Sequence, residues 1–432
     1  MTGKNQSRDM AGAILLLVAW ASWTVWRYWD SYAIDMAAIY IAGHFAWIGD
    51  TPMLYGGNAK SFAIANDPAW RGVLESHGIT GHSGSHYVYP PLWAFAVAPF
   101  TGTFDPISFF NGARVLLVAS LAASILIAWR LMRTPVSPVL FAGFAVLFVE
   151  TTIPAAAALS LGQPQLLVIF LILLGFERYI AGRDTTAGVL LGLAAAIKVT
   201  PIILAVIFLA DRRWRAAGAT ALTAASAAAI SLAVAGVEPH AAFLRGVSWM
   251  ESLMPIVGLN LTFETAAHDF FVPFLPCDPC SDPRMGLDTA WVSQFSRAIL
   301  VVSVGFSIWI TASMPFDDRA RVRLLLISVA SLFFGPLAWM HYYTLPLLIF
   351  LALSPNFGWR WATLASIPVW LGFSHLWMGK LLTEAKAFPF ETFYPQHTAL
   401  LSLAAIVATG MIFIRASSGT ANRAPDTLNQ PG

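Results

Sequence analysis

Long apolar runs follow one another along almost the whole chain, and they limit its fold more than any other feature. A helix that spans a lipid bilayer needs about 20 apolar residues. About twelve runs of spanning or near-spanning length are present, at residues 10–29, 107–131, 137–153, 163–180, 185–197, 200–211, 216–236, 291–313, 322–339, 342–354, 359–377 and 396–415. Only 11% of the 432 residues are charged, whereas soluble domains carry about 25%. The chain is therefore predicted to be an all-α polytopic membrane protein.

The basic residues predict the orientation of this bundle. If the N-terminus is cytoplasmic, most cations fall in inside segments, as the positive-inside rule requires. These cations are Lys4, Arg8, Arg130, Arg133, Arg178, Arg183, Arg212, Arg213, Arg215, Arg319, Arg321, Arg323, Arg360, Arg415 and Arg423. The long outer loops are then residues 30–106 and 237–290, with a shorter one at 378–396. A span at residues 91–100 would reverse the pattern, so that stretch is predicted to be a re-entrant or interfacial helix.

These assignments predict one transmembrane domain over residues 1–415 in the cytoplasmic (inner) membrane, with its functional face toward the periplasm or cell exterior. Residues 416–432 are rich in Ser, Asn, Pro and Gly, and we predict a disordered cytoplasmic tail there. The net charge of +2 is too small to indicate nucleic-acid binding. Membrane lipid is the expected surrounding.

The second outer loop contains the two cysteines of the chain, Cys277 and Cys280. On the oxidising side of the membrane their C-x-x-C spacing fits a local disulfide. A metal site would need two more ligands, and only His268 and Asp269 lie nearby in sequence. We predict no metal site and no cofactor.

Asp35 opens a stretch whose apolar residues repeat at helical spacing on one stripe: Ile34, Ala37, Ala38, Ile41, Phe45 and Ile48. This pattern predicts a juxtamembrane helix on the outer surface of the bilayer. Two interpretations of Asp35 stay open. It is the N-cap of that helix, a position that Asp favours, or it is a carboxylate held at the membrane rim as a general base.

The motif Tyr89-Pro90-Pro91-Leu92 breaks any helix, because the two prolines donate no backbone hydrogen bond and restrict the residue before each of them. The break either ends the first outer loop or forms a rigid edge beside Asp35.

Lys198 interrupts two apolar pieces of about 13 residues, each about 20 Å long as a helix against a hydrocarbon core of about 30 Å. It is therefore predicted to lie recessed in the outer leaflet. An ammonium at that depth is costly unless it is paired or hydrated, so it indicates a polar cavity or an anionic ligand. The alternative is a lysine that extends to the headgroups.

His341 has the same setting, next to a short apolar run and between aromatic residues, although an ordinary interfacial histidine also fits. With Asp35 and Lys198 it forms a set suited to chemistry on a phosphorylated substrate. The carboxylate would take a proton from a hydroxyl, and the cationic groups would stabilise a departing phosphate. Gln163, at the outer start of another run, adds an amide donor.

Short motifs follow one another in a specific order from the first run to about residue 350. They are Asp35 to Tyr40, Gly49 to Tyr55, Tyr89 to Leu92, Gly162-Gln163, Gly188 to Gly192, Lys198 to Pro201, Asn260, and His341 to Tyr343. In this order they resemble glycosyltransferase family 87, the polyprenol-phosphate-mannose-dependent mannosyltransferases with a GT-C fold. Two departures are Gln165, where an Asn is common, and a long insertion at about residues 57–86.

This resemblance implies a membrane glycosyltransferase. It would move a mannose-like sugar, with inversion, from a polyprenyl-phosphate donor to an extracytoplasmic glycan or glycolipid acceptor. Asp35 and His341 would be catalytic, and the resemblance implies Lys198, Gln163, Tyr89 and Asn260 as substrate-binding residues. A transporter or flippase of lipid-linked sugars is the alternative, since it would use the same cations without a base. A noncatalytic scaffold would explain the spans but not the recessed polar groups.

Overall fold

The computed structural model describes residues 3–56, 67–82, 87–253, 260–271, 290–374 and 393–421. Within these ranges the chain is helical, and the only β-structure consists of two isolated bridges. This confirms the all-α class predicted from the apolar runs. The predicted tail begins inside a helix, which ends at Ala421.

The helices lie in two groups along the chain. The N-terminal group consists of α1 (Gly3–Arg27), α2 (Ile34–Trp47), η1 (Thr51–Tyr55), α3 (Pro68–Glu75), α4 (Leu92–Thr101), α5 (Pro106–Leu131), α6 (Pro138–Thr151), α7 (Ile153–Leu161) and α8 (Gln165–Ile180). The remaining helices are α9 (Asp184–Ile197), η3 (Thr200–Leu204), α10 (Ala205–Ala210), α11 (Trp214–Ala235), α12 (Val237–Leu253), α13 (Phe263–Phe271), α14 (Ala290–Ile310), α15 (Phe316–Phe333), η4 (Met340–Tyr343), α16 (Thr344–Leu353), η5 (Ser354–Phe357), α17 (Trp359–Phe373) and α19 (Phe393–Ala421).

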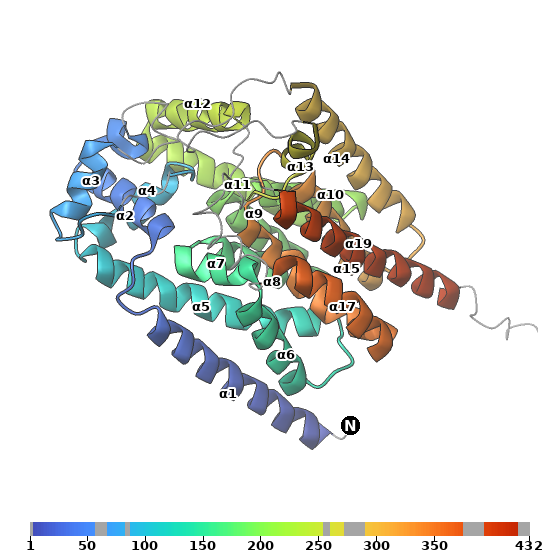
Figure 1. Ribbon diagram of the computed structural model, residues 1–432. Helices are drawn as coiled ribbons and strands as arrows, with labels where there is room; N and C mark the ends of the chain where they lie inside the picture. Colours follow the sequence, from blue (N-terminus) through green and yellow to red (C-terminus); the bar gives the residue numbers. More distant parts are fainter. Residues whose placement is uncertain are drawn as a thin grey trace, which may run out of the picture.

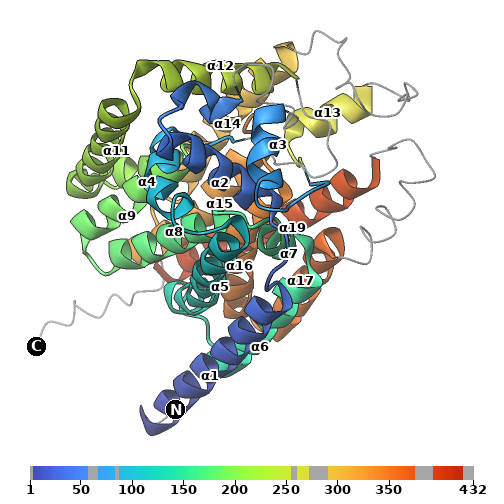
Figure 2. The same ribbon diagram turned by 90° about the vertical axis from the view of Figure 1, so that its left-hand side faces the viewer.

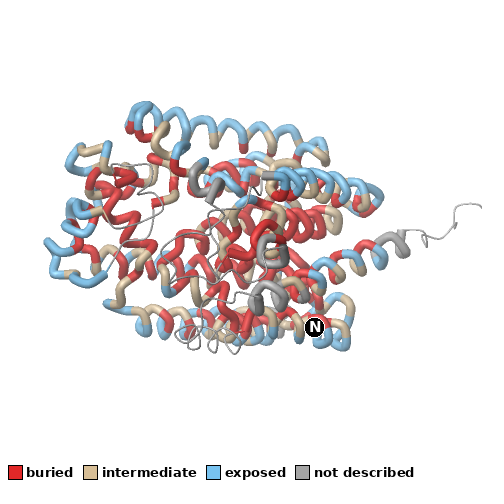
Figure 3. Tube along the Cα trace, turned by 45° about the horizontal axis from the view of Figure 1, so that its top comes forward, coloured by how far each residue is buried: buried red, intermediate tan, exposed pale blue. Residues whose placement is uncertain are grey.

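Four helical segments in the described residues are long and apolar enough to cross a membrane: Ser7–Arg27, Pro106–Leu131, Trp214–Ala235 and Trp291–Ile310. Large apolar side chains on their outer sides are exposed, among them Leu15, Leu222 and Val301. Figure 3 shows the buried residues gathered in the middle of the bundle and the exposed ones on its peripheral helices. Broad apolar exposure of this kind marks a surface that faces lipid, so the chain is a multi-pass membrane protein.

The remaining predicted runs also coincide with helical segments, most of them shorter than a full span. The run predicted at 322–339 is displaced, because α15 begins at Phe316 and ends at Phe333. Its predicted second half is instead extended at Ala338 and Trp339. There the backbone N–H of Leu261 donates to the Ala338 carbonyl over 2.9 Å, and Asn260 forms a bridge with Trp339.

The helices α2, α3 and α4 gather at the end of the bundle toward which α1 runs, far from the N-terminus (Figure 1). Figure 2 shows α2 enclosed by its neighbours and α1 lying beside α6. α4 matches the short helix predicted at residues 91–100. It begins at Leu92, immediately after the two prolines, as those prolines require.

One expectation for α2 is wrong. A one-sided apolar stripe was predicted, but almost every residue from Asp35 to Phe45 is buried. Small side chains allow neighbouring helices to approach α2 from all sides. At Gly43, for example, a Cβ atom would lie 2.7 Å from Val97 and 2.9 Å from Thr101 of α4. α2 therefore packs as an internal helix.

Glycines also bring α9 close to α11. A Cβ atom on Gly188 would lie 2.2 Å from the Ala216 carbonyl oxygen, and one on Gly192 would lie 2.9 Å from that of Thr220. Small residues that allow such close backbone approach are typical of packed membrane helices. The contact holds α9, at whose C-terminal end Lys198 lies.

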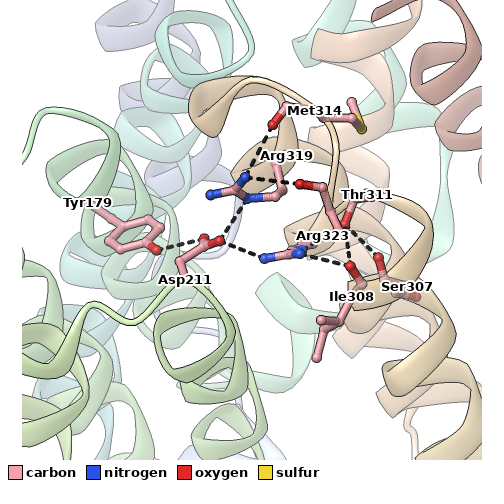
Figure 4. Close-up of polar contacts among 9 residues, drawn as sticks. Tyr179, Asp211, Ser307, Ile308, Thr311, Met314, Arg319 and Arg323 are labelled. Carbon is pink, nitrogen blue, oxygen red and sulfur yellow. Dashed lines mark hydrogen bonds and ion pairs between the residues drawn. The ribbon is translucent and has the colours of Figure 1, made fainter. Parts of the chain in front are cut away.

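A buried polar network ties four helices together at the other end of the bundle (Figure 4). Asp211, which follows α10, accepts hydrogen bonds from Tyr179 of α8 at 2.8 Å and Arg323 of α15 at 2.7 Å. Arg319 Nε lies 2.7 Å from the same carboxylate as an ion pair, although its angle does not make a hydrogen bond. Arg323 also donates to Thr311, just after α14. The cations predicted in this inside segment are therefore partly buried and paired.

Candidate active site

Asp35 lies in the first turn of α2 and is only 9% exposed. The N-cap of α2 is Ala33, so the interpretation of Asp35 as the cap is wrong. Its carboxylate accepts a hydrogen bond from Nε2 of Gln163, which lies between α7 and α8. A carboxylate near a helix N-terminus is favoured by the exposed N–H groups and the dipole of that helix. The sequence places Asp35 there for a second purpose besides packing, because a buried charge needs specific partners.

Gln163 joins the acidic and basic groups of the site. Its Oε1 accepts hydrogen bonds from Nζ of Lys198 over 3.2 Å and from the Tyr89 hydroxyl over 3.0 Å. An ammonium only donates and a carboxylate only accepts, so the amide must direct its oxygen to Lys198 and its nitrogen to Asp35. The side chain therefore holds the two charges near each other while standing between them.

Lys198 is 7% exposed and is the C-cap residue of α9, in an extended conformation before η3. The predicted break in this span is thus confirmed, and the alternative of a lysine reaching the headgroups is wrong. Its ammonium lies 4.2 Å from the ring centroid of Tyr342 and 5.6 Å from that of Tyr89. Among the described residues Lys198 makes no ion pair. Aromatic faces and one amide therefore stabilise a buried cation that has no directly bound counter-ion.

The segment Tyr89-Pro90-Pro91 is a rigid edge of this site, the second of the two roles predicted for it. The Tyr55 hydroxyl donates to the Tyr89 carbonyl over 2.8 Å, and the Tyr87 hydroxyl donates to the Pro90 carbonyl over 3.1 Å. These bonds satisfy carbonyl groups that no helix can use. They hold the Tyr89 ring against Lys198 and its hydroxyl against Gln163.

Gly162 explains how Gln163 comes so close to α2. Its φ of +71° is a conformation that only glycine adopts without strain. A Cβ atom there would lie 3.0 Å from the Cβ atoms of both Ala33 and Met36. The turn before α8 therefore rests directly on the beginning of α2, which places Gln163 against Asp35.

His341, in η4, is 4% exposed, and its Nε2 is buried without a hydrogen-bond partner among the described residues. It therefore differs from the ordinary interfacial histidine that was the alternative. Its ring lies 4.8 Å from that of Tyr342, the residue that contacts Lys198. Lys198 is close enough to exert a charge effect on the His341 ring, and Asp35 exerts one on Lys198. The structure thus brings His341 near the other site residues without a direct bond to them.

Asn260 is buried, and its side chain supports backbone. Its Oδ1 accepts from the Ala338 N–H over 2.9 Å, and its Nδ2 donates to Thr265 Oγ1 over 3.1 Å. These contacts fix the extended segment that leads into η4 and His341. Its predicted part in substrate binding stays a prediction.

No group of three His, Cys, Asp or Glu side chains in the described ranges is arranged to hold a metal ion. Cys277 and Cys280, for which a disulfide was predicted, lie outside those ranges. Asp30 is exposed and bonded to Asn111, and Asp50 precedes η1 in a turn, as expected for residues outside the site.

Sequence reasoning missed two contributors to this geometry. Tyr342 was quoted as an aromatic neighbour of His341, but its cation–π contact with Lys198 joins residues 144 positions apart and has no signal in one sequence. The positive φ of Gly162 was also missed, although a glycine directly before Gln163 was the available signal.

Comparison with known proteins agrees with this arrangement. Glycosyltransferase family 87 matches residues 87–339, a region that includes Tyr89, Gln163, Lys198 and Asn260. The chain is 26% identical over 342 residues to the polyprenol-phosphate-mannose-dependent alpha-(1-2)-phosphatidylinositol pentamannoside mannosyltransferase of Mycolicibacterium smegmatis, an alignment that covers 75% of this chain and 74% of the relative. Since the family match extends over more than half of the sequence, the chain belongs to glycosyltransferase family 87.

Proposed function

We propose that this enzyme transfers a mannose-like sugar, with inversion, from a polyprenyl-phosphate donor to an extracytoplasmic glycan or glycolipid. The proposal includes a GT-C arrangement of about twelve spans in a single domain over residues 1–415, with the site at the outer face of the inner membrane. The name of the mycobacterial relative supports this donor and a glycolipid acceptor. Family membership supports the reaction class.

The observation that carries the proposal is the buried Lys198 ammonium, which a neutral amide separates from Asp35. A buried cation without a bound anion is costly, and the cost falls when an anionic ligand enters. The phosphate of a lipid-linked sugar is such a ligand. It enters a membrane site at headgroup depth while its isoprenoid chain stays in hydrocarbon.

In the proposed reaction the acceptor hydroxyl oxygen attacks the anomeric carbon of the sugar. Asp35 takes the hydroxyl proton as the new carbon–oxygen bond forms. The bond between the anomeric carbon and the phosphate oxygen breaks, and its electron pair leaves with polyprenyl phosphate. Lys198 and His341 face one cavity and stabilise the charge that grows on that phosphate, which is where a preorganised cation lowers the barrier most.

An apolar groove beside the site suits the donor chain. It has a volume of about 530 Å³ and is lined by Met36, Ile39, Trp93, Ala96, Val97, Phe100, Phe104, Ser108, Phe109, Gly112, Ala113, Leu116, Leu117, Pro164 and Leu167. Met36 and Pro164 directly follow Asp35 and Gln163 in the chain. Two other apolar grooves, of about 730 Å³ and 320 Å³, are lined by no candidate site residue.

Filling this groove should discriminate between donors by chain length. A Cβ atom on Gly112 meets nothing within 4 Å, so Gly112→Leu extends into the groove without disturbing α5. We expect the half-saturating concentration of a long-chain donor to rise about tenfold, the usual size of an overpacking cost. A donor with two isoprene units should be unaffected. Gly305→Leu on α14, equally unobstructed, is the control; the same loss for both chain lengths would rule out this groove.

The turn at Gly162 provides a separate test of the site geometry. Gly162→Ala combines left-handed strain with a contact against Ala33 and Met36, so Gln163 should be displaced from Asp35. Gly182→Ala, at φ +74° with nothing within 4 Å, carries the strain alone. Both variants should lose about 1–2 kcal/mol of stability in thermal unfolding. Only Gly162→Ala should also lose transfer activity, and equal activity in the two variants would contradict the proposed role of Gln163.

The alternative, a transporter of lipid-linked sugars, is separated by following the label. The purified protein is reconstituted in liposomes with polyprenyl-phosphate-[¹⁴C]mannose and an extract of envelope glycolipids. We expect radioactivity to move covalently from the donor to a more polar glycolipid. If the label only changes leaflet and all of it is recovered as donor, the protein is a transporter.

A further inference from the structure

Two stacked aromatic rings stand between solvent and Asp35. Tyr32 lies in the segment that joins α1 to α2, three residues before Asp35. The His82 ring stacks on it, with centroids 4.3 Å apart and planes at 23°. Phe110 of α5 supports the Tyr32 ring edge-on at 5.9 Å. His82 is exposed, Tyr32 is half-buried and Asp35 is buried, so this set leads inward from the surface.

The state of the Tyr32 phenol places it beside the carboxylate. Burial first, and then the charge of Asp35, raises the pKa of Tyr32 to about 12. The phenol therefore stays neutral at physiological pH. Its ring lies within electrostatic range of Asp35, on the side of the site opposite the one where Gln163 meets Lys198.

His82 belongs to a part of the chain that is fastened to α2. The Trp70 indole donates to the Met53 carbonyl over 2.8 Å and lies 6.5 Å from the Phe45 ring. His77 meets the Tyr40 ring edge-on at 6.1 Å. These contacts hold the segment over the helix that carries Asp35. The segment precedes residue 87, where the family match begins.

We propose that the His82–Tyr32 stack is the acceptor subsite and that it binds the hexopyranosyl ring that receives the sugar. The inference rests on the proposed function. A donor whose phosphate lies at Lys198 occupies one side of Gln163, so the acceptor must reach Asp35 from the other side, where Tyr32 lies. One face of a pyranose carries C–H groups that pack on the outer face of the imidazole, and planar rings give such contacts rigidity. Its hydroxyl groups then lie toward the carboxylate.

Steady-state transfer by the full-length enzyme tests this subsite. The donor is polyprenyl-phosphate mannose and the titrated acceptor is the envelope glycolipid extract. His82→Ala should raise the half-saturating acceptor concentration about 2- to 12-fold, the range for one aromatic contact. The half-saturating donor concentration and the maximal rate should not change. His82→Phe keeps a planar ring and should restore acceptor binding, while Thr80→Ala, an exposed residue of the same loop, should match the wild type.

Each other outcome has a definite meaning. An unchanged acceptor requirement in His82→Ala overturns the subsite, and so does an equal change for donor and acceptor. A Phe variant that behaves like the Ala variant shows that the stacking face does not bind the acceptor, which also overturns it. If the wild-type enzyme transfers nothing, the proposed function itself has failed, and this result is separate from any effect of His82.

Discussion

Asp35→Asn should lower the rate of sugar transfer by about 10²- to 10⁴-fold, the contribution of a positioned acid–base group. This equals about 2.7–5.5 kcal/mol of transition-state stabilisation. Asn has nearly the same shape as Asp, and its carbonyl oxygen still accepts the hydrogen bond that Gln163 donates to Asp35. The fold and the donor site at Lys198 should persist, so donor binding should be unchanged while the maximal rate falls.

Asp50→Asn is the matched control, because Asp50 lies in the same outer loop at the far end of α2 and caps η1 without a side-chain bond. Its transfer rate should equal that of the wild type. A fully active Asp35→Asn enzyme, or an equal loss in both variants, would contradict the assignment of Asp35 as the base.

Lys198→Met should weaken donor binding about 10- to 100-fold, as expected when a hydrogen bond to a charged group is lost. Methionine keeps the apolar stem and removes the charge, so packing between the Tyr89 and Tyr342 rings should largely remain. Transfer should slow as well, because the same cation stabilises the departing phosphate. Titration of the half-saturating donor concentration and the maximal rate measures both effects.

Val199→Met introduces the same side chain at the exposed neighbouring position and should leave both parameters unchanged. The thermal unfolding of Lys198→Met should differ little from that of the wild type, because the variant also removes the cost of a buried ammonium. Unchanged donor binding in Lys198→Met would show that the phosphate lies elsewhere.

The sequence predicted features that depend on local length and chemistry. Two apolar pieces too short to span required a break at Lys198, and α9 ends there. The prolines after Tyr89 excluded a helix, and α4 begins only at Leu92. Such predictions succeed because backbone geometry and bilayer thickness act on neighbouring residues.

Contacts between distant residues could not be predicted in this way. The stack of His82 on Tyr32 and the enclosure of α2 depend on how elements far apart in sequence meet. Asp35 was open to interpretation as an N-cap for the same reason, since only its contact with Gln163, 128 positions away, distinguishes the two roles. Buried arginines such as Arg323 were counted as loop charges because their partner Asp211 lies 112 positions away.

The anomeric configuration of the product tests the central claim most directly. Donor labelled with ¹³C at the anomeric carbon is incubated with the purified enzyme and the glycolipid extract, and the product is examined by NMR. A single displacement assisted by Asp35 predicts a product whose anomeric configuration is opposite to that of the donor, formed by the wild type and scarcely by Asp35→Asn. A product with retained configuration would contradict the account, because it requires two displacements and therefore a different role for Asp35.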